Sequence, residues 1–147
     1  MSNHKSAFAA VLLFALAAFI APVYAAEERV PLRGMLWERV KGEAIIKDTA
    51  DVEGQKQFNI QASGLEPNSV YTVWFANRER AGDIKGAGVE DYSFKTDGSG
   101  NGAYVTTLTE YQIRDWDLIQ VAFHPDGNPR NLDSAQIALT GDLRRLR

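Results

Sequence analysis

The feature that most constrains this chain is a two-residue period of apolar and polar side chains, which recurs after the first 25 residues. Residues 57–62 alternate strictly and place Phe58 and Ile60 on one face, and residues 119–123 and 135–139 repeat the pattern. Successive side chains of a β-strand point to opposite faces, so this period predicts strands with one buried face rather than helices.

Other short runs rich in β-branched and aromatic residues are further strand candidates: 34–39, 44–47, 70–76, 92–95 and 103–108. Turn-forming residues separate the runs, at 53–54, 67–68, 97–102 and 125–129. The one helix-like window is 109–117. The spacing predicts an all-β fold, an antiparallel immunoglobulin-like β-sandwich of about seven to eight strands.

The N-terminus has the three parts of a secretory signal peptide. A short polar start with Lys5 precedes an apolar run over residues 7–21, and Val23-Tyr24-Ala25 follows with small residues suited to a peptidase. We therefore predict a signal peptide at residues 1–25 and a single domain at 26–147, in the periplasm or secreted, with no membrane span after cleavage. The alternatives are cleavage after Ala26 and retention of the run as an anchor, although it is shorter than the roughly 20 residues of a spanning helix.

Composition narrows the classes of function. Removing 25 of the 147 residues leaves 122, enough for an ordinary core, and loss of Lys5 takes the formal charge from −3 to −4. Such a mildly acidic domain gives no electrostatic reason to expect nucleic acid as a partner. The chain has no cysteine, which excludes disulfides, thiol chemistry and cysteine-ligated zinc.

The segment from Gly64 to Val73 contains Leu65, Pro67, Ser69 and Tyr71 at alternate positions. This spacing resembles the tyrosine corner of fibronectin type III and related immunoglobulin-like sandwiches, where the chain crosses between sheets. The resemblance implies that the Tyr71 hydroxyl forms a hydrogen bond to the backbone a few residues upstream while its ring lies in the core. The chain after Tyr71 is much longer than in a fibronectin module, so the topology must differ.

The corner is followed by Trp74, a glycine-rich stretch and an Asp97-Gly98 turn. In this order the segment is loosely similar to the extracytoplasmic β-domain of anti-sigma-K-type factors. That resemblance implies a β-sandwich without catalytic activity.

Two loops carry residue types that bind metals. Asp97, Ser99 and Asn101 stand at alternate positions, as in the first half of a calcium loop, with a glycine at the sixth position. The twelfth position is Leu108 instead of glutamate, so a hairpin loop is the competing interpretation. Calcium is the one cofactor that this pattern suggests, and otherwise none is predicted.

The second loop begins at His124, the only histidine after residue 25, and Asp126 or Asp133 would have to complete a metal site there. The competing interpretation is that His124 only forms hydrogen bonds within its loop. A carboxylate-based hydrolase is a further alternative, with Glu90-Asp91 and Asp115-x-Asp117 as the acidic pairs. No nucleophile elbow or phosphate loop occurs, and no catalytic residue is predicted.

Residues 77–90 form the strongest candidate for a binding loop, because they are charged and interrupted by glycines, and the competing interpretation is a mobile, solvated connection. The candidate binding residues are Arg78, Arg80, Asp83 and Lys85 in this loop, together with Trp116 and His124. Three tryptophans and three tyrosines offer an aromatic platform for sugar or peptide: Trp37, Trp74, Trp116, Tyr92, Tyr104 and Tyr111. Trp74 is expected in the core and Trp116 exposed. The leading hypothesis is a non-catalytic exported domain that binds a protein or glycan partner of the cell envelope.

Overall fold

The structure, a computed structural model, describes residues 26–146. They form nine strands, one short helix and a terminal 3-10 turn: β1 Glu27–Gly34, β2 Lys41–Asp48, β3 Gln55–Ser63, β4 Val70–Ala76, β5 Ile84–Gly86, β6 Ser93–Lys95, β7 Gly102–Thr109, α1 Glu110–Arg114, β8 Leu118–His124, β9 Gln136–Asp142 and η1 Leu143–Leu146. All strand pairs are antiparallel, which confirms the prediction of an all-β fold. The predicted signal peptide lies outside the described residues.

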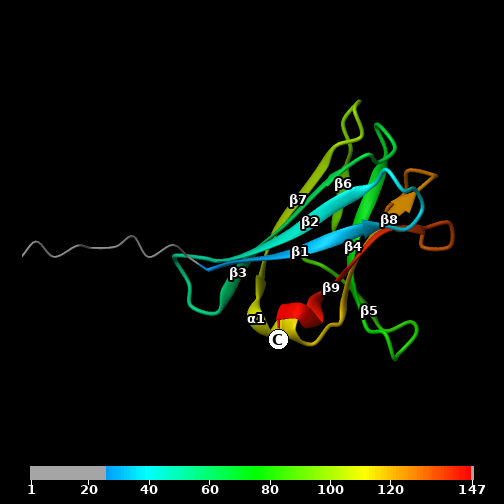
Figure 1. Cartoon of the computed structure of the whole chain (residues 1–147). Helices are drawn as coiled ribbons and strands as arrows, with labels where there is room; N and C mark the ends of the chain where they lie inside the picture. Colours follow the sequence, from blue (N-terminus) through cyan, green and yellow to red (C-terminus); the bar gives the residue numbers. More distant parts are fainter. Residues whose placement is uncertain (1–25, 147) are drawn as a thin grey trace, which may run out of the picture.

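The strands belong to one curled sheet in the order β5-β4-β8-β9-β1-β2-β3-β7, with β6 also paired to β4 (Figure 1). Most neighbours share long ladders, but β1 and β9 pair only at Arg33 with Thr140 and at Gly34 with Leu139. This short ladder joins two halves, β1-β2-β3-β7 and β9-β8-β4 with its edge strands. The two halves face each other across the core.

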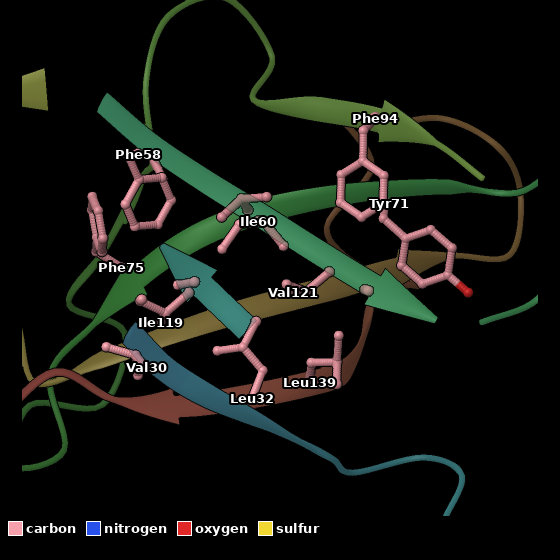
Figure 2. Close-up of a cluster of buried hydrophobic side chains, with 14 of the residues drawn as sticks. Val30, Leu32, Phe58, Ile60, Tyr71, Phe75, Phe94, Ile119, Val121 and Leu139 are labelled. Atoms are coloured by element: carbon pink, nitrogen blue, oxygen red, sulfur yellow. The ribbon is translucent and has the colours of Figure 1, made fainter. Parts of the chain in front are cut away.

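The core is lined by the inward faces of both halves (Figure 2). Phe58 of β3 meets Phe75 of β4 edge-on, with ring centroids 5.5 Å apart, and Tyr71 stacks on Phe94 at the same separation. Phe58, Ile60 and Val121 are fully buried, as the two-residue period predicts. Burial of such side chains stabilises the fold by about 1.5–3 kcal/mol each.

The corner at Tyr71 has the local geometry that its sequence suggests. The Tyr71 ring is fully buried, and its hydroxyl accepts a hydrogen bond of 3.0 Å from the backbone N–H of Glu66. Burial raises the pKa of the Tyr71 hydroxyl, so it stays protonated well into alkaline solution. Beside it, the buried Thr96 hydroxyl donates to the Glu66 carbonyl at 2.6 Å and accepts from Ser69 N–H at 2.9 Å. These hydrogen bonds fix the backbone at Glu66 and Ser69, just before β4 begins.

Most strand predictions coincide with observed strands, but the one over residues 34–39 is wrong. β1 ends at Gly34, and a turn follows in which Val40 N–H donates to the Trp37 carbonyl at 3.2 Å. The true strand, residues 27–34, contains Pro31, which lowers its strand propensity. It tolerates the proline because β9 pairs only with the last two residues of β1, so most of that edge has no ladder partner.

Two further predictions are refined by the structure. The helix-like window contains α1, which begins with a capping box between Thr109 and Gln112. The alternation in 135–139 is broken, because the β8–β9 register shifts between Val121 and Ala122, and Ala138 and Leu139 are both buried. A β-bulge puts one extra residue into a strand, which is why strict alternation fails there.

Candidate binding site at the interrupted edge of strand β4

On the side away from β8, strand β4 pairs with two short strands, β5 and β6, and the chain between them is not part of the ladder. Trp74 of β4 pairs with Gly86 of β5, whereas Thr72, two residues earlier, pairs with Ser93 of β6. Thr72 and Trp74 are two residues apart, whereas their partners Ser93 and Gly86 are seven apart. The partner chain therefore contains five more residues than a regular ladder would have between β5 and β6. The backbone of Val73 holds the two ends of this insertion, because its N–H donates to the Tyr92 carbonyl at 3.0 Å and its carbonyl accepts from the Ala87 N–H at 2.9 Å.

The interruption holds residues in an unusual backbone conformation. Glu90 and Tyr92 have positive φ angles of 61° and 49°. Such a conformation costs a non-glycine residue of order 1–3 kcal/mol, and it is maintained only where surrounding contacts enforce it. Insertions into edge strands are frequent beside functional sites, where they re-aim a side chain.

The side chain that is re-aimed here is Tyr92. Its ring lies directly over Gly86, so closely that a Cβ at this glycine would collide with the ring atoms. The ring also meets Trp74 edge-on, with centroids 5.0 Å apart and planes at 71°. Only glycine at position 86 leaves room for the Tyr92 ring. The ring can therefore lie beside Trp74 on the outer face of β4.

Trp74 and Tyr92 line a surface hollow of about 360 Å³ together with Glu90, Asp91, Pro129, Arg130 and Leu132. Asp91 accepts from the Ser93 hydroxyl at 2.7 Å, and this hydrogen bond, with the nearby charge of Arg130, lowers the pKa of the Asp91 carboxyl. The hollow therefore presents an aromatic pair, an ionised carboxylate and a guanidinium within one concavity. These are the polar and aromatic groups that orient a small ligand in a binding site.

A chain of hydrogen bonds fixes Trp74 from behind. The indole Nε1–H donates to Thr72 Oγ1 at 2.7 Å, and Thr72 Oγ1 lies 2.7 Å from His124 Nε2. His124 Nδ1 lies 3.1 Å from the Asn131 carbonyl, which can only accept, so Nδ1 carries the proton. In the neutral imidazole Nε2 then accepts from the Thr72 hydroxyl, and the chain joins β4 to the loop 125–135 that carries Arg130.

His124 is thus a buried structural residue, with 1% of its surface exposed and both ring nitrogens in hydrogen bonds. The bond to Asn131 stays within the loop, as the second interpretation of its sequence context expects, whereas the bond to Thr72 reaches β4. Asp126 holds its own loop by accepting from Asn128 N–H at 3.0 Å and from Asn131 Nδ2 at 2.6 Å. These hydrogen bonds lower the pKa of the Asp126 carboxyl.

The loop with Asp97, Ser99 and Asn101 connects β6 to β7, which share no ladder, since β6 pairs with β4 and β7 pairs with β3. The Asp97 carboxylate accepts from the backbone N–H groups of Asn101 and Ser99, both at 2.9 Å, and these bonds lower the pKa of Asp97. Within residues 26–146 no three histidine, aspartate or glutamate side chains come together as metal ligands. The calcium and His124-centred hypotheses gain no support from this arrangement.

The predicted binding loop 77–90 is not one open loop, because β5 and the buried Gly86 and Ala87 lie within it. Its charged residues are also dispersed. Arg78 pairs with Asp142 of β9 at 2.9 Å, and Arg80 pairs with Asp83 at 3.4 Å. Lys85 is exposed on β5 opposite Phe75.

The predicted aromatic platform does not form as a group of six. Trp116 is half-buried and stacked on Phe75, with ring centroids 6.3 Å apart, so the expectation that it is exposed is wrong. Tyr104 donates to the Ala87 carbonyl at 2.7 Å, while Trp37 packs on Phe123. The expectation that Trp74 lies in the core is also wrong, because Trp74 is half-buried and lines a surface hollow. Of the six, Trp74 and Tyr92 are the two that come together in that hollow. A sequence signal existed in Gly86 and Gly88 beside an acidic pair, but nothing local indicated which aromatic residue would fold onto Gly86.

The fold and the site define an all-β domain that presents a small aromatic and charged hollow at an interrupted sheet edge. No helix within residues 26–146 has the length and apolar character needed to cross a membrane. Comparisons of this chain with protein-family models, with curated proteins and with solved structures give no match.

Proposed function

We propose that this protein is an exported, non-catalytic binding domain of the periplasm or cell surface, and that its ligand is a glycan. The observation that carries the proposal is the folding of Tyr92 onto Gly86 and Trp74 by a strained five-residue insertion. The same insertion brings Glu90 and Asp91 to the hollow. Export rests on the signal-like N-terminus.

A glycan fits the hollow better than a protein surface does. The hollow has a volume of about 360 Å³, which lies in the range of small-ligand sites, whereas a stable protein interface covers roughly 800 Å² on each partner. The C–H edges of a sugar ring carry partial positive charge that suits the electron-rich aromatic faces of Trp74 and Tyr92. Asp91 accepts and Arg130 donates hydrogen bonds, which together match the hydroxyl groups of a sugar.

We further infer that the two halves of the curled sheet act as the two layers of an immunoglobulin-like sandwich frame. The short β1–β9 ladder, the facing aromatic pair Phe58–Phe75 and the Tyr71 hydrogen bond support this inference. In such a sandwich the proposed ligand site lies at the interrupted edge of β4 and does not include core residues.

The test is a screen of neutral and acidic envelope oligosaccharides, followed by isothermal titration calorimetry of those that bind. Tyr92→Ala and Gly86→Ala should each weaken binding about tenfold, because the first removes the ring and the second displaces it. Two matched controls should stay within about twofold of wild type. Tyr111→Ala removes an aromatic ring that is 77% exposed elsewhere, and Gly98→Ala adds a Cβ where no atom lies within 4 Å.

The proposal fails if no oligosaccharide binds, or if the two site variants bind as well as the two controls. A peptide or protein that binds through Tyr92 in place of a sugar would keep the site but contradict the ligand class.

A further inference from the structure

A second and larger hollow lies on the outer face of the sheet, where β9 is the neighbour of both β1 and β8. It has a volume of about 440 Å³ and includes none of the residues of the hollow at Tyr92. Most of its exposed lining is apolar, and Pro31, Met35, Leu118 and Ile137 contribute to it. Met35 is 60% exposed, so its side chain is accessible to a ligand in this hollow.

Three arginines stand around this apolar groove, namely Arg33, Arg78 and Arg145, with Asp142 as the one acidic residue in its lining. The Asp142 carboxylate is already engaged, since it pairs with Arg78 at 2.9 Å and with Arg144 at 3.4 Å. Arg33 and Arg145 form no ion pair with any residue between 26 and 146. The groove thus has unneutralised positive charge on a protein whose formal net charge is −3.

An apolar groove with cationic groups at its margin matches a ligand that has an apolar body and one anionic group. Guanidinium groups bind carboxylates in a two-pronged geometry, and such charge-assisted hydrogen bonds are stronger than neutral ones. The volume lies in the range of sites that enclose most of a small ligand. A folded protein partner would find only a narrow apolar contact here, too small for a stable interface.

We propose that this groove binds a fatty acid of medium chain length, with the carboxylate held by Arg33 and Arg145 and the acyl chain on the apolar lining. Each buried methylene contributes about 0.8 kcal/mol. Affinity should therefore rise with chain length until the groove is filled. Removal of the carboxylate should weaken binding even when the chain length is unchanged.

The test uses the whole domain 26–147 and sodium dodecanoate below its micellar concentration, with binding measured by calorimetry. Hexanoate and dodecanol probe chain length and charge separately. The double variant Arg33→Gln, Arg145→Gln should weaken dodecanoate binding at least about tenfold, as loss of a charge-assisted contact predicts. Met35→Gln, at an exposed position that leaves the core untouched, should weaken binding severalfold through the apolar lining.

Arg130→Gln is the matched control, because it removes an arginine from the other hollow and should leave dodecanoate binding unchanged. Backbone amide shifts in the NMR spectrum should move in β1, β8 and β9 on addition of dodecanoate and stay constant at residues 88–92. The proposal is overturned if dodecanoate does not bind, if dodecanol binds as tightly, or if the double variant binds like wild type. It is also overturned if the same amides shift with protein concentration alone, since a second copy would then cover the groove.

Discussion

The two edges of the curled sheet differ in how regular they are. β7 pairs with β3 without interruption from Gln55–Thr109 to Ala62–Gly102, and β3 pairs with β2 just as continuously. At the other edge, β4 meets β5 and β6 with five residues excluded from the ladder. The regular half is stabilised by complete ladders and buried faces. At the interrupted edge several backbone pairs are missing, and the chain there places Tyr92 over Gly86. The difference separates a region of complete ladders from an edge whose ladder is interrupted, and the proposed glycan site lies at the interrupted edge.

The largest effect should come from the packing between the halves. Phe58→Ala removes a fully buried ring that meets Phe75, and the cavity should reduce the free energy of unfolding by about 3–5 kcal/mol. Urea denaturation followed by circular dichroism measures this change. A loss below about 1 kcal/mol would mean that the halves do not depend on each other for stability.

A smaller loss is expected at the corner that leads into β4. Tyr71→Phe keeps the ring in the core but deletes the acceptor of the Glu66 N–H, which should lower the free energy of unfolding by about 1–2 kcal/mol. Glycan affinity should not change, because Tyr71 faces the core. If glycan affinity falls while the free energy of unfolding is unchanged, the corner at Tyr71 is coupled to the glycan site. The proposed independence of that site from the core is then wrong.

The strain at the interrupted edge can be measured by a matched pair of variants. Glu90→Gly and Glu90→Ala both remove the carboxylate, but only glycine is relaxed at a φ of 61°. The glycine variant should be more stable than the alanine variant by about 1 kcal/mol in urea denaturation. Equal stability of the two variants would show that the insertion holds no backbone strain at this position.

The smallest effect concerns the acid range. Hydrogen bonds from the backbone of Asn101 and Ser99 lower the pKa of Asp97 in the folded state. Their contribution to stability is therefore complete above the unfolded-state pKa of about 4 and is lost as the pH falls through the lower folded-state pKa. Asp97→Asn should flatten the dependence of the urea midpoint on pH below about pH 4 and leave the slope above pH 5 unchanged. An identical acid slope in the variant would contradict this assignment.

The sequence predicted the core better than it predicted the site. Alternation placed Phe58, Ile60 and Val121 in the interior, because the period of a strand is a local property of the backbone. The same rule failed at residues 34–39, where a turn replaces the expected strand, and it missed that Pro31 is compatible with a strand that has one mostly unpaired edge. Local patterns do not report which neighbour a strand will have.

For the sites, sequence reasoning grouped residues by their closeness in the chain, and the structure groups them differently. Arg78, Arg80, Asp83 and Lys85 were expected to act together because they are close in the chain, yet Arg78 lies with Asp142 and the others stay near β5. Arg33 and Arg145 share a groove although they come from opposite ends of the domain. Contacts across such distances in the chain depend on strand order, which no short motif encodes.

By itself the sequence determined the strand period, the signal-like N-terminus, the absence of cysteine and the corner at Tyr71, since each depends on residues that are adjacent or nearly so. Only the tertiary structure decided that Tyr92 lies on Gly86, that His124 holds Trp74 through Thr72, and that an apolar groove is bordered by arginines. The physical reason is that these contacts join segments far apart in the chain, and they exist only once the sheet has curled and fixed the register of β4 against its neighbours.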